Sequence, residues 1–328
     1  MTPPPSAPDP SPDSATGVLA GAALQGDRRA LARLLTVVEN GGEEAHEALG
    51  TLGTASRAAA IVGITGAPGA GKSTLTSRIV ERVRADGDRV AVLAIDPTSA
   101  FTGGAILGDR VRMQTHDTDP DVFIRSMATR GHLGGLSRAT PQAIAVLESV
   151  GYPWVLVETV GVGQVEVAVA RAADTVVVVV NPGWGDGVQA SKAGLLEIGD
   201  VFVVNKADRD GVSETRRDLE SMLALAGTRE WRPPIIETVA TDGRGIDELW
   251  AAIAAHHAHL TGSGELAHRQ VARVREELRG IVLERLQVEA DRACSGETFD
   301  AVLKRVAARE LDPYAAAEQL LENAGGNS

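Results

Sequence analysis

A glycine-rich octapeptide is the part of the sequence best suited to bind phosphate. Residues 66–73 read Gly-Ala-Pro-Gly-Ala-Gly-Lys-Ser, which fits the pattern G-x-x-x-x-G-K-[ST]. Glycines let backbone N–H groups turn inward around phosphate oxygens, and the start of the following helix adds partial positive charge. We expect Lys72 to reach the β- and γ-phosphates of a nucleotide and the Ser73 hydroxyl to bind Mg²⁺.

A second motif, N-K-x-D at residues 205–208, favours guanine as the base. The Asp208 carboxylate can accept hydrogen bonds from N1–H and the 2-amino group of guanine, whereas adenine has no N1–H to offer. We expect Asn205 to brace the loop and approach N7, and the Lys206 stem to pack on the base plane. Residues 238–240 end the next apolar run and either add backbone N–H groups to the base site or form an ordinary strand end.

Carboxylates follow two other apolar runs. Asp96 and Glu158 end predicted strands at the sheet edge where ligands bind in α/β proteins. Glu158 and Gly161 stand where many GTPases have D-x-x-G, with the acid near Mg²⁺ and the glycine amide near the γ-phosphate. Val162 follows Gly161, where small GTPases place the glutamine that orients water. Gln164 comes two residues later, so we expect slow intrinsic hydrolysis that a partner stimulates.

Apolar runs alternate with helical patterns from residue 59 onward, and this indicates the framework around these motifs. The runs are mostly continuous rather than alternating, as in strands buried on both faces. They occupy 61–64, 90–95, 154–157, 175–180, 201–204 and 235–239. Helical patterns lie between them at 75–84, 141–149 and 214–225. The order predicts an α/β fold of the P-loop NTPase type with a mainly parallel sheet.

The two ends of the chain differ from this middle part. Residues 1–16 are rich in proline and polar side chains and are expected to form a disordered tail. Leucines at helical spacing predict an N-terminal helical region over 17–55, broken near Gly41–Gly42. We assign 56–260 to the nucleotide-binding domain and 261–328 to C-terminal helices, with Thr261–Gly264 as a linker and Asp312-Pro313 starting the last helix.

Composition excludes several classes of protein. The 328 residues have a formal net charge of −12, which argues against a nucleic-acid partner because phosphate backbones need a basic face. The single cysteine, Cys294, excludes an intramolecular disulfide framework and a multi-cysteine zinc site. No apolar run approaches the ~18–20 residues of a membrane span. We therefore expect a cytoplasmic protein without a membrane partner.

Several further segments, taken with the two motifs, resemble the MeaB/ArgK group of GTPases. They are 95–99 (Ile-Asp-Pro-Thr-Ser), 103–110, 123–126, 131–135 and 157–164 (Val-Glu-Thr-Val-Gly-Val-Gly-Gln). The group consists of chaperones of adenosylcobalamin-dependent acyl-CoA mutases of the methylmalonyl-CoA type. The resemblance implies that GTP, GDP and Mg²⁺ are bound, and that cofactor loading and removal of damaged cofactor are gated. It also implies a homodimer formed through the C-terminal helices.

The resemblance adds residues to those argued from chemistry. Asp96, Asp109 and Glu158 match positions tied to Mg²⁺ and the switches, and Asp186, Gln189 and Lys192 match a third switch that signals to the mutase. Gly187 replaces a usual acidic residue there, and Val239 a usual serine. The expected catalytic residues are Lys72, Asp96, Asp109, Glu158 and Gly161, and the expected Mg²⁺ ligands are Ser73, Asp96, Asp109 and Glu158. The expected nucleotide-binding residues are Gly66, Ala67, Pro68, Gly69, Ala70, Gly71, Lys72, Ser73, Thr74, Asn205, Lys206, Asp208, Val239 and Ala240.

Two other functions remain as alternatives. One is a GTPase that delivers nickel or cobalt, since His256, His257 and His259 cluster in the sequence; no cysteine accompanies them, and a solvated helix end is the preferred interpretation. The other is an ATP-dependent kinase of a small metabolite, against which the N-K-x-D motif argues. The apolar seam from Val271 to Ile281 is interpreted equally well as core packing or as a dimer contact.

Overall fold

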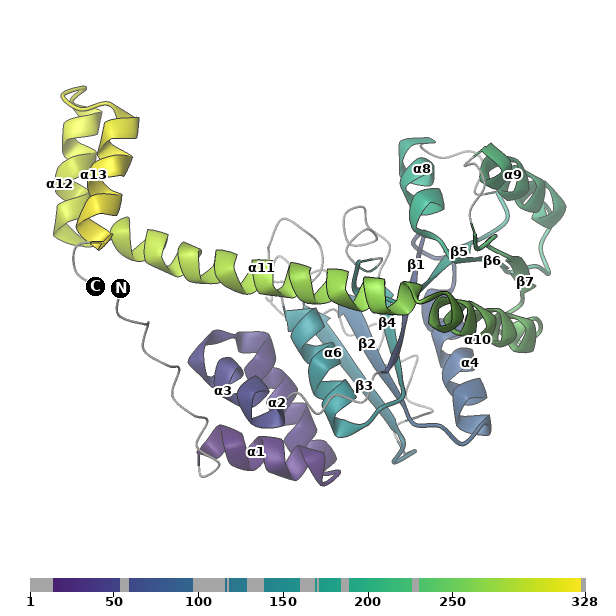
Figure 1. Ribbon diagram of the computed structural model, residues 1–328. Helices are drawn as coiled ribbons and strands as arrows, with labels where there is room; N and C mark the ends of the chain where they lie inside the picture. The colour runs from purple at the N-terminus through teal and green to yellow at the C-terminus, as the bar shows by residue number, and fades with distance from the viewer. Residues whose placement is uncertain are drawn as a thin grey trace. The chain divides into compact units, whose positions relative to one another are not determined.

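The computed structural model describes residues 14–53, 59–96, 116, 118–128, 139–159, 169, 171–183, 189–225 and 230–325. The chain divides into two compact units, one ending at Gln270 and the other beginning at Val271. The first unit holds a single sheet of seven parallel strands in the order β3-β2-β4-β1-β5-β6-β7 (Figure 1). The strands are β1 (Ala60–Gly66), β2 (Val90–Asp96), β3 (Val122–Ala128), β4 (Trp154–Thr159), β5 (Thr175–Val180), β6 (Val201–Asn205) and β7 (Ile235–Thr238).

The predicted α/β fold of the P-loop NTPase type, with a parallel sheet, is confirmed. Every residue of β1, β5 and β6 is buried, which is why these strands read as continuous apolar runs. The strand that the sequence did not reveal is β3, at the edge of the sheet. Its polar residues Arg125 and Ser126 interrupt the apolar run, and they are only partly buried there.

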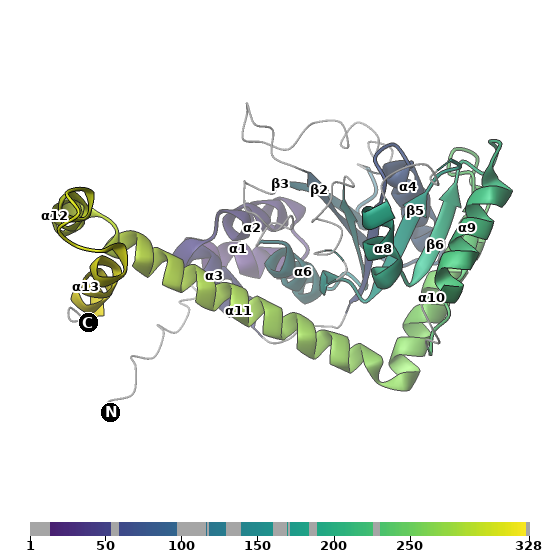
Figure 2. The same cartoon turned by 90° about the horizontal axis from the view of Figure 1, so that it is seen from above.

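Helices cover both faces of the sheet. On one face, α4 (Lys72–Ala85) and α10 (Ile246–Ser263) bury side chains such as Ile79 and Ile253 against the strands. On the other face lie α6 (Ala139–Val150), α8 (Gln189–Ile198) and α9 (Val212–Leu225). Figure 2 shows α4 and α6 on opposite sides of the strands. Since all neighbouring strands pair in parallel, they all end at the same edge of the sheet.

Three N-terminal helices lie on α6 and the edge strand β3: α1 (Ala15–Leu24), α2 (Arg28–Asn40) and α3 (Gly42–Leu52). The expected break at Gly41–Gly42 is present, with both glycines at positive φ. The Arg28 guanidinium donates to the carbonyl oxygens of Asp119 (2.7 Å) and Val122 (2.6 Å), and Arg125 pairs with Glu39 at 2.7 Å. The helix α1 begins at Ala15, capped by Ser14, so the expected tail boundary at residue 16 is two residues too late.

The expected linker at Thr261–Gly264 is wrong in length. The helix α10 runs on to Ser263, and only Gly264, at φ 79°, separates it from α11 (Glu265–Ala293). Glycine adopts this left-handed conformation without strain, which allows one residue to end a helix.

The second unit holds the rest of α11 with α12 (Gly296–Ala307) and α13 (Pro313–Gly325). Val302 and Ala316 are buried where α12 and α13 pack together. Asp312 Oδ1 accepts from the Tyr314 amide at 2.9 Å, which confirms the predicted start of α13. Along α11, Val271, Val274 and Leu278 are more than half exposed. Each helix in the described ranges is too short or too polar to cross a membrane.

Candidate functional site

The glycine-rich segment forms a tight loop between the end of β1 and the start of α4. Gly66 has φ 136° and Gly71 has φ 94°. A Cβ atom on Gly66 would overlap the Val179 carbonyl, and one on Gly71 would overlap the Asn205 amide. These two positions therefore require glycine for both conformation and space. The loop ends directly in the first turn of α4, where free N–H groups and the helix dipole favour an anion.

Lys72 and Ser73 occupy that first turn and are both buried. The Lys72 ammonium donates to the carbonyl oxygens of Gly66 (2.8 Å) and Ala67 (3.0 Å), so it lies over the loop. The Ser73 hydroxyl donates to Glu158 Oε1 at 2.6 Å. This contact joins the start of α4 to the end of β4.

The strand-end carboxylates come from neighbouring strands. Glu158 is 3% exposed, and its Cα pairs with Ile64 of β1 and Ala94 of β2. Asp96 is the last residue of β2, and its side chain lies outside the described residues, as do Asp109 and Gly161. A serine hydroxyl beside a carboxylate is an oxygen donor set that suits Mg²⁺, which typically takes one or two protein ligands and completes its shell with phosphates and water.

The predicted base motif begins at the last residue of β6. Asn205 Nδ2 donates to the Ala70 carbonyl at 2.8 Å, while its Oδ1 accepts from the Thr238 hydroxyl (3.0 Å) and the Ala240 amide (3.2 Å). A single buried amide thus connects the phosphate loop to the end of β7. Lys206 has φ 61°, unusual for a residue with a side chain, and its ammonium donates to the Gly69 carbonyl at 2.6 Å.

A pocket of about 130 Å³ lies between these segments. It brings together members of all three predicted groups: the phosphate loop, the N-K-x-D motif and the end of β7. Its lining is Gly71, Thr74, Asn205, Lys206, Asp208, Arg209, Val239, Ala240 and Thr241. Arg209 and Thr241 were not predicted, and neither was Arg78, which donates to the Ala240 and Thr241 carbonyls. The only signal for Arg78 is its place one helical turn after Thr74.

The predicted third switch is described only in part. Asp186 lies outside the described residues. Gln189 and Lys192 belong to the first turn of α8, but their side chains lie outside the description. The helix starts after the carboxyl end of β5, on the same edge of the sheet as the phosphate loop.

The histidine cluster differs from the expected solvated helix end. His256 is completely buried within α10, its Nδ1 lies 2.9 Å from the Thr175 hydroxyl, and its Nε2 lies 3.4 Å from Asp200 Oδ1. Burial lowers the pKa of His256 to about 4, against the opposing effect of the Asp200 carboxylate. Sequence spacing could not show this, because the covering residues come from other elements.

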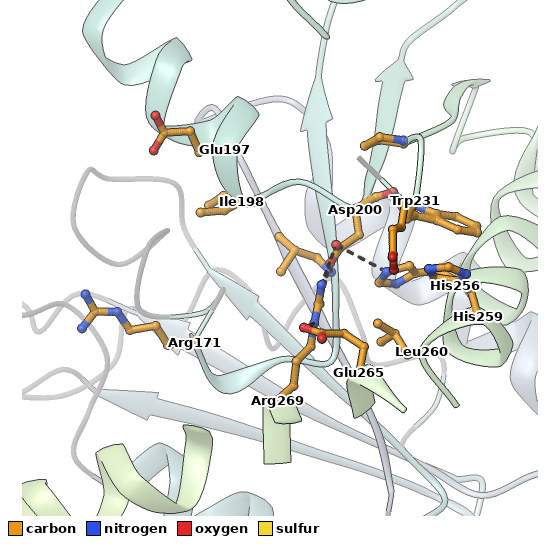
Figure 3. Close-up of a pocket in the computed structure, with 13 residues that line it drawn as sticks. Arg171, Glu197, Ile198, Asp200, Trp231, His256, His259, Leu260, Glu265 and Arg269 are labelled. Carbon is orange, nitrogen blue, oxygen red and sulfur yellow. Dashed lines mark hydrogen bonds and ion pairs between the residues drawn. The ribbon is translucent and has the colours of Figure 1, made fainter. Parts of the chain in front are cut away.

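Figure 3 shows the Asp200 carboxylate between the His256 ring and the Arg269 guanidinium. These residues line a pocket of about 480 Å³ near the amino ends of β5 and β6, the edge opposite the phosphate loop. Among the described residues, no group of three or more His, Cys, Asp or Glu side chains could hold a metal ion.

Comparisons with known proteins identify the family of the chain. Residues 31–295 match the family model described as methylmalonyl Co-A mutase-associated GTPase MeaB. A protein of Pyrococcus abyssi with a provisional GTPase name is 50% identical, covering 91% of this chain and 93% of its own. The GTPase ArgK of Escherichia coli is 39% identical over 74% of this chain and 76% of its own.

A solved structure, that of a LAO/AO transport system kinase, is similar over most of the chain. The alignment covers 94% of this chain and 97% of the other at 29% identity, with a TM-score of 0.68. The match to the family model and the two relatives named as GTPases together extend over most of this sequence. The chain therefore belongs to the MeaB family of GTPases, binds guanine nucleotide and hydrolyses GTP.

Proposed function

We propose that this protein is a GTP-operated chaperone of an adenosylcobalamin-dependent acyl-CoA mutase of the methylmalonyl-CoA type. It gates loading of the cofactor and removal of damaged cofactor. The family description names a mutase-associated GTPase. A mouse relative named methylmalonic aciduria type A homolog is 40% identical over 62% of this chain and 50% of its own. Both names support a mutase as the client.

In this proposal the phosphate loop binds the triphosphate and the pocket of about 130 Å³ receives the guanine. The loop from Gly66 to Ser73 supplies N–H groups, and the Lys72 ammonium exchanges its loop carbonyls for phosphate oxygens. Asp208 reads N1–H and the 2-amino group, while Lys206 covers the base. Thr74, Val239 and Ala240 complete the lining. Water attacks the γ-phosphorus, the bond to the β–γ bridging oxygen breaks, and GDP and phosphate leave.

Ser73 and Glu158 are the described residues that would hold Mg²⁺. Their oxygens are 2.6 Å apart, so both already face one point beside the phosphate loop. Asp96 and Asp109 are proposed to contribute from the positions that the family resemblance gives them. Mg²⁺ there would neutralise charge on the β- and γ-phosphate oxygens.

The observation that carries the gating proposal is the contact between Ser73 and Glu158. If the Ser73 and Glu158 oxygens both bind one Mg²⁺, its octahedral geometry sets them about 2.9 Å apart, further than the 2.6 Å of the present contact. Binding of nucleotide with Mg²⁺ would therefore move a residue at the end of β4, directly before residues 160–164. A shift at a strand end is a local event that can bias a switch loop between two states. GTP and GDP can gate a client only if these states differ in affinity for it.

The proposed route to the client is the start of α8, where Asp186, Gln189 and Lys192 form the third switch. A lysine there can pair with a carboxylate in one nucleotide state and release it in the other. The proposed homodimer uses the exposed seam of α11, where Val271, Val274 and Leu278 present an apolar stripe.

Phosphate release with and without candidate mutases tests this proposal. We expect slow release by the isolated protein and a severalfold rise with the right mutase. Lys192→Ala should bind GTP nearly as well as the wild type in calorimetry but lose that rise. Its cobalamin transfer, followed by absorbance, should no longer depend on GTP. Arg217→Ala, an exposed cation on α9, is the matched control. Rapid turnover by the isolated protein that no mutase alters would refute the chaperone function.

A further inference from the structure

Arg78 connects the helix that follows the phosphate loop to the wall of the predicted base pocket. Its Nε donates to the Ala240 carbonyl at 3.0 Å, and one terminal nitrogen donates to the Thr241 carbonyl at 2.9 Å. The other terminal nitrogen pairs with Glu81 at 2.8 Å on the same helix. The planar guanidinium thus binds two successive carbonyls of the wall, which a lysine ammonium could not do in this forked geometry.

The wall at residues 239–241 is held from its other side as well. The Ala240 amide donates to Asn205 Oδ1 at 3.2 Å, so the Ala240 peptide is tied to α4 through its carbonyl and to β6 through its N–H. Val239, Ala240 and Thr241 all line the pocket of about 130 Å³. The position of this wall therefore sets the width of the space for a base.

We propose that Arg78 is a positioning residue for base recognition: it fixes the distance between the phosphate loop and the wall of the base pocket. The proposal rests on the guanine site described above. Thr74, one turn before Arg78 on α4, lines the same pocket, so the helix that begins at the phosphates also anchors the wall. A wall already in place loses less conformational entropy when the base binds. Without the guanidinium, the pocket has to be ordered by the nucleotide itself.

The competing interpretation is that Arg78 serves only its ion pair with Glu81. Both side chains are about a third or more exposed, at 34% and 45%, and such pairs contribute little to stability. Glu81→Gln separates the two interpretations, because it removes the ion pair and leaves the guanidinium on both carbonyls. Arg82→Ala is a second control, since Arg82 lies on the same helix and pairs with Asp86 and Asp247 instead.

Calorimetry with GDP, IDP, ADP and inorganic tripolyphosphate tests the proposal on the full chain. Hypoxanthine has the N1–H and O6 of guanine but lacks the 2-amino group. We expect Arg78→Ala to weaken GDP and IDP to a similar extent, about fivefold or more, because two hydrogen bonds to the wall are lost. The ratio of GDP to IDP affinity should stay constant, since Asp208 reads the 2-amino group. Tripolyphosphate affinity should change less than about twofold, the scale of a negligible free-energy difference.

The variant Arg78→Lys should recover part of the GDP affinity, and Glu81→Gln and Arg82→Ala should bind GDP like the wild type. Unchanged GDP affinity in Arg78→Ala would overturn the proposal, as would an equal loss of tripolyphosphate affinity. A wild-type protein that binds ADP as tightly as GDP would instead refute the guanine site on which the proposal rests.

Discussion

The two edges of the central sheet both hold buried polar side chains, but these side chains have different kinds of partners. At the carboxyl edge, Lys72 donates to carbonyls of its own loop and Ser73 donates to Glu158. At the amino edge, Asp174 accepts from the Ile61 amide at 2.9 Å and Asp200 accepts from the Val176 amide at 2.8 Å. The first set of contacts joins groups that a nucleotide could also bind, whereas the second joins one strand to the next.

This difference predicts which residues bind nucleotide and which are structural. The Asp200 carboxylate also accepts hydrogen bonds from both terminal nitrogens of Arg269, at 3.1 and 3.2 Å. The backbone carbonyl of Asp200 accepts a hydrogen bond from the Trp231 indole N–H at 2.8 Å. These bonds hold the residue before β6 to α11 and to the segment that precedes β7. Substitutions at the carboxyl edge should therefore affect nucleotide chemistry at little cost in stability, and those at the amino edge should do the reverse.

The largest expected effect is at the carboxyl edge. Lys72→Ala should abolish measurable GTP hydrolysis, a loss of about a thousandfold or more. In this variant no ammonium group at residue 72 stabilises the negative charge on the transferred phosphoryl group. Nucleotide binding should weaken as well, and the melting temperature without nucleotide should stay close to that of the wild type. Phosphate release and thermal unfolding measure the two effects. Arg82→Ala on the same helix is the control, and a Lys72→Ala protein that still hydrolyses GTP would contradict this assignment.

Asp208→Asn should change which base is bound. Loss of two hydrogen bonds to a carboxylate should weaken the binding of GTP by about 2–4 kcal/mol. Xanthine nucleotides should gain affinity, because the new amide offers a donor to the xanthine O2. Competition binding with GTP, XTP and ATP measures the change. Asp210→Asn, two residues further along and exposed, should bind like the wild type. Equal affinity of the unmodified protein for ATP and GTP would refute the predicted base site.

Asp200→Ala tests the amino edge and should act on stability. It leaves the Val176 amide and the Arg269 guanidinium without their carboxylate, so we expect a loss of about 2–3 kcal/mol in the free energy of unfolding. Urea unfolding followed by tryptophan fluorescence measures this loss. GDP affinity below the unfolding transition should be unchanged. Asp247→Ala, whose side chain is 84% exposed, is the control. Weakened GDP binding with intact stability would reverse the comparison between the two edges.

The buried His256 should make the stability of the protein depend on pH. The pKa of His256 is about 4 in the folded protein against 6.5 ordinarily, so the unfolded chain binds the proton more readily. The contribution of His256 is therefore fully present above about pH 6.5 and is lost as the pH falls toward 4. Between pH 7 and 5, we expect the free energy of unfolding of the wild-type protein to fall by about 1–2 kcal/mol more than that of the His256→Asn variant. His268→Gln should drop like the wild type, because His268 is exposed.

The fold could be predicted from the sequence in large part because of how parallel strands are buried. Six of the seven strands are apolar runs with little polar interruption, and covering helices lie between them. The phosphate loop could also be predicted from the sequence. Gly66 and Gly71 adopt positive φ angles and lie so close to other atoms that a Cβ atom would not fit. The strand β3 was not readable, because Arg125 within it is balanced by Glu39 from a helix far away in the sequence.

What the sequence determined by itself is thus local: which segments form strands and helices, where the backbone must turn, and which motif can surround phosphate. The tertiary structure alone decided which polar residues surround the proposed nucleotide site and which bind other parts of the protein. His256 looked like part of a solvated helix end, yet Trp231 and Asp200 cover it from other elements. The acceptors of Arg78 lie 162 and 163 residues further along the chain. The spacing of residues encodes a helix or a strand, but partners this distant become neighbours only when the sheet brings their elements together.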